Sequence, residues 1–542
     1  MTIREPILRT ERDIADAKLF GWRLALLVTA LAVGNVIALS NVPGYTALVP
    51  YAAGSLQGVN PSFGTWGTTH HMMGIVLGLP IARWLAARFG DYRVYALTFI
   101  CYAFFSLLCA QSETIWFFTP ARFLLGLAGG VILPLGQGIA LNEFPENRRT
   151  LCVALWAALS MAPFTLGVFM GGFWAEYFNW RMLFYSNIIL GLPIAGFVAA
   201  LLHGRSVKRR IARFDAIGFA LLFVIIVGVQ IMLNQGNDFD WFGSPFLMLT
   251  LLVVTVATPL FVFWEFGERT PVLDLRLFAR RNYAVAVACS VAGFLIIQGT
   301  LSVFIGQLQT LIGNSSSLAG AIYLFMAILA VPIVSIVHEI VRDVDLRLVA
   351  CINFIGFAVV LSWLGRYDKL ASFDEIALPM IFFGFFLGTF FAPLAAMGVQ
   401  DFSGARAIRA AEELTMLRTA AGAFGIASQA VVQFRRAPFH QLGLADQLGG
   451  RRYPSLDLLQ TLTDKLTALG MSDPVAKSLI ARLMRQQSLL LGLDDAFYFG
   501  AFVFAILAAV VWFARGPGHR AAPPPAKTID ALAIEELTDQ PY

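Results

Sequence analysis

Runs of about 20 mostly apolar residues recur along almost the whole chain, and they constrain its fold more than any other feature. One helix of about 20 residues crosses the roughly 30 Å hydrocarbon layer of a bilayer. Of the 542 residues, 58% are hydrophobic and only 13% are charged, too few to cover a water-soluble protein of this length. The chain is therefore predicted to be an all-α integral membrane protein that has the lipid bilayer as its surroundings.

The apolar runs predict about fourteen transmembrane helices. Their expected ranges are 22–42, 67–86, 94–112, 117–141, 150–174, 182–203, 214–235, 245–266, 283–309, 317–338, 346–364, 376–400, 412–434 and 494–514. The first run has full span length and lacks a small-residue cleavage site, so it is expected to stay as the first helix.

The basic residues predict which way these helices cross the membrane. With the N-terminal tail 1–21 in the cytoplasm, most of the 39 Lys and Arg residues fall on that side, as short cytoplasmic loops require. The short loops on the other side hold only Arg181, Arg366 and Lys369. Both termini are therefore expected in the cytoplasm. The excess of basic residues in cytoplasmic segments explains the net charge of +5, so no nucleic-acid partner is expected.

Residues 437–491 form one long polar insertion, which this topology places outside the cell membrane. Ser455 is expected to cap a helix whose apolar stripe ends at Gly470, and Asp473 to start a second amphipathic helix. Leu459, Leu462, Leu466 and Leu469 make up that stripe. The insertion either covers the protein's own loops or docks on a partner. The tail 515–542 is predicted to be disordered and cytoplasmic.

Motifs typical of enzymes are absent from the sequence. There is no phosphate-binding loop, no zinc-ligand spacing and no GxSxG element, so we expect no catalytic residues, no metal site and no cofactor. The five cysteines all lie in apolar runs and are expected to act as small buried apolar residues.

Several short motifs carry a family resemblance. They are FDAIG at 214–218, QGNDFDW at 235–241, PVLDLRLF at 271–278, and Trp180-Arg181 followed by Phe184 and Asn187. Together they resemble the major facilitator superfamily, and specifically its fourteen-span EmrB/QacA-type drug:proton antiporters. The resemblance runs from about residue 22 to 515.

The resemblance implies an architecture and a function. We expect a six-helix bundle at 22–203, an extra hairpin at 214–266 and a second six-helix bundle at 283–514. Such a protein would be a non-enzymatic, proton-driven multidrug exporter of small lipophilic compounds in the bacterial inner membrane. A periplasmic adaptor and an outer-membrane channel would complete a tripartite efflux system. The alternatives are export of a native metabolite, an uncoupled facilitator, or a membrane sensor that transports nothing.

The proton pathway departs from the family pattern. Where the family usually has an acid in its first span, this chain has Asn41, which cannot titrate. His70 or His71 could carry the proton instead, since histidine titrates near neutral pH, but each could also be a satisfied interfacial histidine. Arg122 matches the family's fourth-span arginine, and a functional role is expected for an arginine in an apolar span. By position in the spans, all four residues should lie in one layer near the outer surface.

Two further groups are candidates for moving parts. In span 5, Gly167, Gly171 and Gly172 follow the displaced Pro163, and they form either a gating hinge or an ordinary close helix contact. The loop between spans 2 and 3 keeps a degraded form of the superfamily's cytoplasmic motif. Its Arg88, Gly90 and Arg93 either lock one conformational state or serve only as positive-inside charge.

Polar side chains in the second half are candidates for the substrate pathway. Gln298 and Gln307 could bind substrate by hydrogen bonds or simply join helices. Arg418 matches an arginine of the family's thirteenth span and is assigned to the cytoplasmic gate. Extension of its side chain to the cytoplasmic interface is the alternative.

Overall fold

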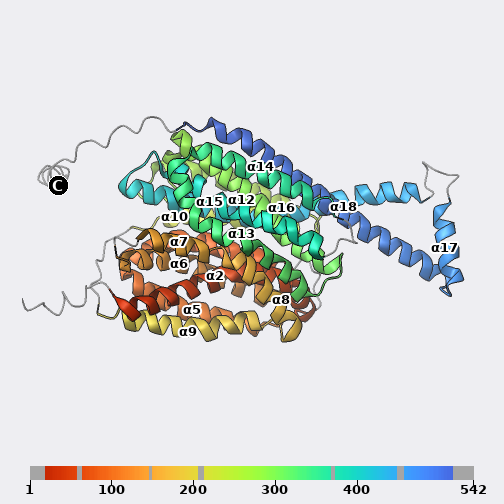
Figure 1. Cartoon of the computed structure of the whole chain (residues 1–542), viewed down its shortest axis with the longest axis horizontal. Helices are drawn as coiled ribbons and strands as arrows, with labels where there is room; N and C mark the ends of the chain where they lie inside the picture. Colours follow the sequence, from red (N-terminus) through yellow and green to blue (C-terminus); the bar gives the residue numbers. More distant parts are fainter. Residues whose placement is uncertain are drawn as a thin grey trace, which may run out of the picture.

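The computed structural model describes residues 19–57, 64–145, 149–204, 213–367, 373–448 and 457–516. These residues form helices and connecting segments, and the described part of the chain contains no strand. Figure 1 shows the N-terminal helices packed side by side in one half of the molecule and the C-terminal helices in the other half. The predicted all-α class is thus confirmed.

The N-terminal bundle has six spans, of which the fifth is interrupted by a π-helical turn. Its elements are α2 (Gly21–Ser55), α4 (Trp66–Phe89), α5 (Asp91–Ala110), α6 (Ile115–Glu143), α7 (Arg149–Leu159), η2 (Pro163–Gly167), α8 (Val168–Tyr177) and α9 (Met182–Leu201). Its core is rich in buried aromatic rings, including Tyr45, Tyr95, Phe99, Phe118 and Phe184. Helix α4 packs on α6, and α5 packs on α9.

The C-terminal bundle also has six spans. Its elements are η4 (Leu275–Ala279), α12 (Arg281–Thr310), α13 (Ser316–Asp343), α14 (Leu346–Leu364), α15 (Phe373–Val399), α16 (Gly404–Gln447), α17 (Leu458–Ala468), α18 (Asp473–Val510) and η5 (Val511–Phe513). Helix α12 packs on α16, α13 on α15, and α14 on α18. Phe357 and Phe504 stack with ring centroids 4.7 Å apart in the core of this bundle.

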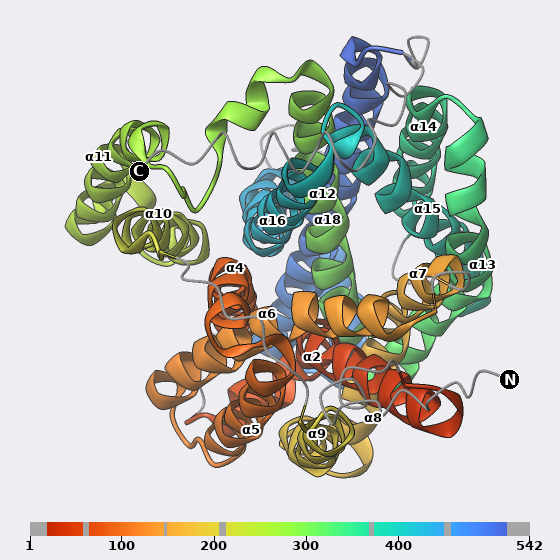
Figure 2. The same ribbon diagram turned by 90° about the vertical axis from the view of Figure 1, so that its left-hand side faces the viewer.

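An extra hairpin lies outside both bundles. It consists of α10 (Ala216–Gln235), η3 (Trp241–Gly243) and α11 (Pro245–Gly267). Helix α10 packs on α4 and α16, and Figure 2 shows the hairpin beside these two helices at the edge of the molecule. Most of α11 is exposed and apolar, as expected for a helix that faces lipid.

Local side chains decide where several spans begin. Thr114, Ser315 and Asp345 precede α6, α13 and α14, and each accepts a hydrogen bond from a backbone N–H of the first turn. Gly90 ends α4 and starts α5 directly, with φ of 93°. Only glycine adopts this conformation without strain, so the tight connection depends on it.

Thirteen described helices are long and apolar enough to cross a membrane. The remaining predicted span, 412–434, lies within α16, which is 44 residues long and packs against α12, α18 and α4. Charged residues in its first half lower its apolar character. The prediction of two six-helix bundles with an inserted hairpin is therefore confirmed, and the least apolar helix is enclosed by its neighbours.

The predicted insertion 437–491 is built differently from expectation. Helix α16 continues beyond its span to Gln447, and the predicted second amphipathic helix and the last span are one helix, α18. At about 1.5 Å per residue, α16 and α18 are roughly 66 and 57 Å long, about twice the hydrocarbon thickness. We call the described residues of 437–491 the stalk; it projects from the helical body (Figure 1).

The stalk and Leu311 line an apolar pocket of about 620 Å³ that is open to the surroundings. Leu462 and Leu466 of the predicted stripe line it, whereas Leu459 and Leu469 are exposed. The predicted cap Ser455 lies outside the described residues, and Asp457 caps α17 through a hydrogen bond from the Gln460 N–H. The predicted tails 1–21 and 515–542 also lie mostly outside the described residues.

Candidate transport pathway and gating contacts

A polar cluster lies inside the N-terminal bundle around Asn41 of α2. The Asn41 side chain is fully buried, and its Nδ2 donates to the Tyr102 hydroxyl at 2.7 Å and to Asn187 Oδ1 at 3.0 Å. Asn187 Nδ2 in turn lies 3.2 Å from Asn41 Oδ1 and 3.1 Å from the Ser106 hydroxyl. The cluster therefore ties α2 to α5 and α9 with neutral groups.

Arg122 of α6 completes this cluster from the other side. Its Nε donates to the Gly67 carbonyl at 2.9 Å, and its Nη2 and Nη1 donate to the carbonyl and Oδ1 of Asn41 at 3.0 and 3.3 Å. The guanidinium carbon lies 4.5 Å from the centre of the Tyr45 ring. All these partners are neutral, so a fully buried cation is held by carbonyl dipoles and an aromatic face.

The structure separates the two histidines. His71 is fully buried, and its Nδ1 lies 3.2 Å from the Arg122 carbonyl. His70 is partly buried, and its Nδ1 lies 2.8 Å from the carbonyl of Trp66, one turn earlier in the same helix. Neighbouring helix positions point about 100° apart, so only His71 joins the cluster of Asn41 and Arg122.

The predicted hinge residues bring helices very close together. Pro163 starts the π-helical turn η2, and Gly167 ends it. A Cβ added to Gly171 would lie 2.1 Å from the Gly44 carbonyl of α2. A Cβ added to Gly172 would lie 2.1 Å from the carbonyl of Ser316, which belongs to the other bundle. The fifth span thus contains both an irregular turn and close helix contacts. Gly172 lies at the contact between the two bundles.

More contacts join the bundles on the stalk face, the face of the body from which the stalk projects. Gln309 of α12 donates to the Ala47 carbonyl of α2 at 2.6 Å. Glu176 of α8 accepts a hydrogen bond from the Ser317 N–H of α13 at 2.8 Å. These bonds connect helices that belong to different halves of the chain.

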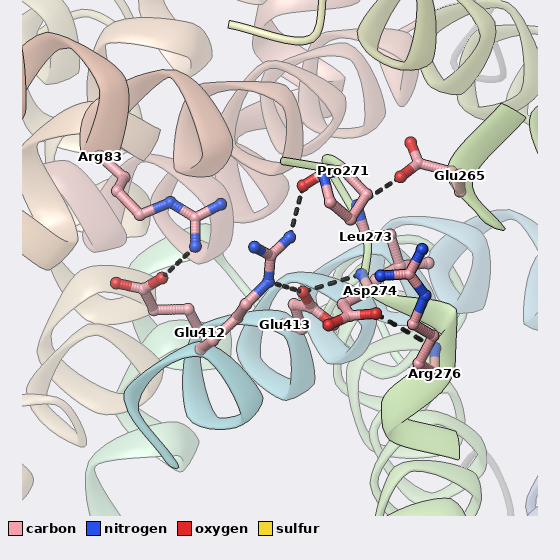
Figure 3. A network of polar contacts seen from close by, with 9 residues as sticks. Arg83, Glu265, Pro271, Leu273, Asp274, Arg276, Glu412 and Glu413 are labelled. Carbon is pink, nitrogen blue, oxygen red and sulfur yellow. Dashed lines mark hydrogen bonds and ion pairs between the residues drawn. The ribbon is translucent and has the colours of Figure 1, made fainter. Parts of the chain in front are cut away.

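The opposite face has its own contact between the bundles. Arg83 of α4 forms an ion pair with Glu412 of α16 at 2.9 Å (Figure 3). The predicted gate residues lie nearby in sequence but contact their own segment. Arg88 lies over the Trp84 ring at 5.8 Å, and Arg93 donates to the Tyr92 hydroxyl at 3.1 Å.

A second network ties the linker after the hairpin to α16. The Glu413 carboxylate accepts hydrogen bonds from the Asp274 N–H and from Arg409 Nε, both at 2.9 Å. Arg409 also donates to the Pro271 carbonyl. Glu265 of α11 accepts from the Leu273 N–H at 3.3 Å. Figure 3 shows this network next to the Arg83 ion pair.

The predicted residues of the second half lie in different surroundings. Gln298 is buried in α12, and Gln307 has a buried Oε1 without a hydrogen-bond partner among the described residues. The Arg418 guanidinium lies over the rings of Phe391 and Phe294, 4.4 and 5.7 Å from their centres. The structure does not join Arg418 to Arg88 and Arg93, with which it was grouped.

The sequence reasoning missed the charged residues that make the contacts on the opposite face. The sequence motifs gave no role to Arg83, Arg409, Glu412, Glu413 or Glu265. The sequence did contain a signal for these residues, namely acidic residues at the ends of apolar helices. A buried carboxylate needs a hydrogen-bond or charge partner, so such acids indicate a contact. Within the described residues, no group of three or more His, Cys, Asp or Glu side chains is placed to hold a metal ion.

Comparison with known families decides what kind of protein carries these features. The family described as Major Facilitator Superfamily matches residues 24–430, well over half of the chain. The chain belongs to the Major Facilitator Superfamily. The fold is likewise that of superfamily transporters with two six-helix bundles.

Known relatives extend over nearly the whole chain. Multidrug export protein EmrB of Escherichia coli (strain K12) is 27% identical over 498 residues, which cover 92% of this chain and 96% of that protein. Fatty acid resistance protein FarB of Neisseria gonorrhoeae is 27% identical over 501 residues, which cover 92% and 97%. The predicted resemblance to EmrB-type members of the superfamily is confirmed.

Solved structures of transporters share the fold. A bacterial homologue of the human lysosomal transporter Spinster, inward-facing and occupied, aligns with a TM-score of 0.59 and 12% identity over 92% of this chain and 97% of that chain. A mutant of the peptide transporter POT aligns with a TM-score of 0.61 and 12% identity over 94% and 100%. At such low identity the likeness concerns the fold alone.

Proposed function

We propose that the protein is a secondary active exporter of lipophilic or amphipathic compounds that works by alternating access in the bacterial inner membrane. The similarity to EmrB and FarB supports this function, since EmrB is named for multidrug export and FarB for resistance to fatty acids. A transporter of this fold needs no catalytic site. Both termini would lie in the cytoplasm, in keeping with the distribution of basic residues.

The observation that carries the proposal is that small, separable contacts join the two bundles at both faces. The Arg83–Glu412 ion pair joins them at the predicted cytoplasmic face, and the Gln309–Ala47 hydrogen bond joins them at the stalk face. Rocking one bundle against the other would break one set while keeping the other. A pathway between the bundles would then open to one side of the membrane at a time.

We propose that inward proton flow drives this export. The neutral partners of Arg122 favour a second candidate, an uncoupled facilitator or an exporter of a native metabolite, because Asn41 cannot exchange a proton. His71 is the titratable side chain nearest to this cluster along α4, and it contacts the Arg122 backbone. Replacing His70 or His71 with Gln tests each histidine, and unchanged pH dependence in both variants would exclude them.

Transport by the purified full chain in proteoliposomes tests the function itself. A fluorescent lipophilic cation and an amphipathic carboxylic acid are the probes, with protein-free liposomes as the control. We expect export that accelerates when an inward proton gradient is imposed. Movement that ignores the gradient would support the facilitator. If neither probe moves in any condition, the sensor alternative is favoured.

We further propose that the stalk binds a periplasmic adaptor that leads to an outer-membrane channel. Phe439, Leu442, Leu469 and Val475 of the stalk are all exposed, so several large apolar side chains of the stalk are available for a protein interface. We expect Leu442→Ser with Leu469→Ser to abolish drug resistance in cells but to leave export by proteoliposomes unchanged. Lys477→Ser, at an exposed polar position, is the control. Equal loss in both assays would mean that the stalk serves the exporter alone.

A further inference from the structure

Two buried carboxylates meet where the extra hairpin begins and ends. Asp215 precedes α10 and is 8% exposed, and Glu265 lies near the end of α11 and is 1% exposed. On the long exposed helix α11, the described buried residues are three apolar side chains and Glu265. An acid buried on a helix that faces lipid requires an explanation.

One oxygen of each carboxylate is already engaged. Asp215 Oδ1 accepts hydrogen bonds from the Gly218 N–H and from Trp264 Nε1, both at 2.9 Å. Glu265 Oε2 accepts from the Leu273 N–H at 3.3 Å. The other two oxygens, Asp215 Oδ2 and Glu265 Oε1, are buried and have no hydrogen-bond partner among the described residues.

The two unpartnered oxygens lie close together over Gly218. A Cβ added there would lie 2.2 Å from Asp215 Oδ2 and 2.5 Å from Glu265 Oε1, so the oxygens are no farther apart than these two distances together. Glycine is the only residue that leaves room for both carboxylates. Asp215 and Gly218 are both part of the FDAIG segment, 214–218.

The surrounding charges do not neutralise the pair. Glu413 and Arg409 of α16 also act on Glu265, but Arg409 is bound to Glu413 and to the Pro271 carbonyl. Asp274 of the linker adds another acid nearby. Among the described residues, neither Asp215 nor Glu265 forms an ion pair. Two buried negative charges at this separation are unfavourable, and one proton between them removes the repulsion and supplies the missing donor.

We propose that Asp215 and Glu265 form a proton-binding site in which the two carboxyl groups share one proton. The site is connected to α16 through the linker, because Glu265 accepts from the Leu273 N–H and Glu413 accepts from the next N–H, that of Asp274. Loss of the proton leaves two repelling charges at the base of the hairpin. Since Glu413 follows Glu412, the site acts on the helix turn that carries the contact with Arg83.

Infrared difference spectroscopy on the purified full chain without substrate tests the site. We expect one carboxylic acid carbonyl band that disappears as pH rises. Glu265→Gln and Asp215→Asn keep the hydrogen-bond acceptor for Leu273 and the helix cap, so both variants should fold, and each should lose the band. Glu339→Gln, an exposed acid of α13, should keep it.

Two results would overturn the proposal. The first is a wild-type spectrum without a titrating acid band at any pH. The second is a band that persists in both Glu265→Gln and Asp215→Asn. Thermal stability that rises with added sodium or magnesium, without an acid band, would assign the pair to a metal cation instead and would equally overturn it.

The role of this proton in transport rests on the proposed function and is tested separately. In proteoliposomes, Glu265→Gln should lose the pH dependence that wild type and Glu339→Gln share. Unchanged pH dependence together with loss of the acid band would leave the site intact and remove its coupling to export. If wild type transports neither probe but the band titrates, the proposed function fails and the proton site stands.

Discussion

Each bundle carries an arginine in an apolar span, but the two arginines have different surroundings: Arg122 is fully buried and Arg418 is partly buried. Arg122 in the N-terminal bundle donates to two backbone carbonyls and to the Asn41 side chain. Arg418 in the C-terminal bundle lies over Phe391 and Phe294, and it forms no hydrogen bond or ion pair with the described residues. Sequence alone made both of them candidates for function.

The difference shows that an arginine within a span can have two roles. It can hold helices together through its hydrogen bonds, as Arg122 does, or keep its N–H groups free for another partner, as Arg418 does. Each of the three guanidinium nitrogens of Arg122 donates a hydrogen bond to α2 or α4, so Arg122 connects these helices to α6. Aromatic faces stabilise Arg418 by about 0.5–2 kcal/mol but leave its N–H groups free. Arg418 can therefore bind an anionic part of a substrate, whereas Arg122 could do so only by losing hydrogen bonds that hold the N-terminal bundle together.

The largest expected effect follows from removing the anchor. Arg122→Met loses three hydrogen bonds. We expect a loss of unfolding free energy of about 2–5 kcal/mol, at roughly 0.6–1.7 kcal/mol per bond in a membrane interior. Thermal unfolding in detergent measures it. A stability loss no larger than that of Arg418→Met would contradict the distinction between the two arginines.

The second effect concerns transport more than stability. Arg418→Met removes only ring contacts and should lower stability by at most about 2 kcal/mol. Export of an amphipathic carboxylic acid should be lost, while export of a lipophilic cation should persist. Arg418→Lys, which keeps the charge, should retain part of the acid export. Equal loss for both probes would show that Arg418 serves packing or gating.

The third prediction restores an acid to the neutral cluster. Asn41→Asp places a carboxylate against Arg122 and should make export depend more steeply on the proton gradient. Its effect on stability should be small, about 1–2 kcal/mol, because buried ion pairs nearly break even. Asn353→Asp is the matched control, since Asn353 is also buried but donates to Thr389 and the Phe386 carbonyl instead of lying beside an arginine. Identical proton dependence in wild type and Asn41→Asp would contradict the prediction.

The smallest effect is expected at an exposed arginine. Arg83 and Glu412 are 42% and 41% exposed, so Arg83→Glu should cost only about 0.5 kcal/mol. The contact should nevertheless influence which face is open, as measured by cross-linking between α4 and α16. The double reversal Arg83→Glu with Glu412→Arg should restore the wild-type cross-linking yield. Arg342→Glu, beside Glu339 within one helix, is the control.

The helices could be predicted from the sequence more completely than the site. The range 346–364 matches α14 to the residue, because an apolar run bounded by a capping Asp345 is a local signal. Asn41, His71 and Arg122 were expected in one layer, and the structure brings them together. The direction of His70 and the reach of Arg83 to Glu412 were not predictable, since both depend on helix rotation and on partners far away in the chain.

The sequence by itself determined that this protein is a bundle of membrane-spanning helices with an inserted hairpin and a long polar insertion. Insertion into lipid depends on the length and hydropathy of each segment, and both are local properties. Only the tertiary structure decided which arginine donates hydrogen bonds from every guanidinium nitrogen and which has ring contacts alone among the described residues. Arg122 donates a hydrogen bond to Asn41, which is 81 residues away in the sequence, and Arg83 pairs with Glu412, which is 329 residues away. No local pattern specifies such pairs, because they form only when helices from distant parts of the chain pack against each other.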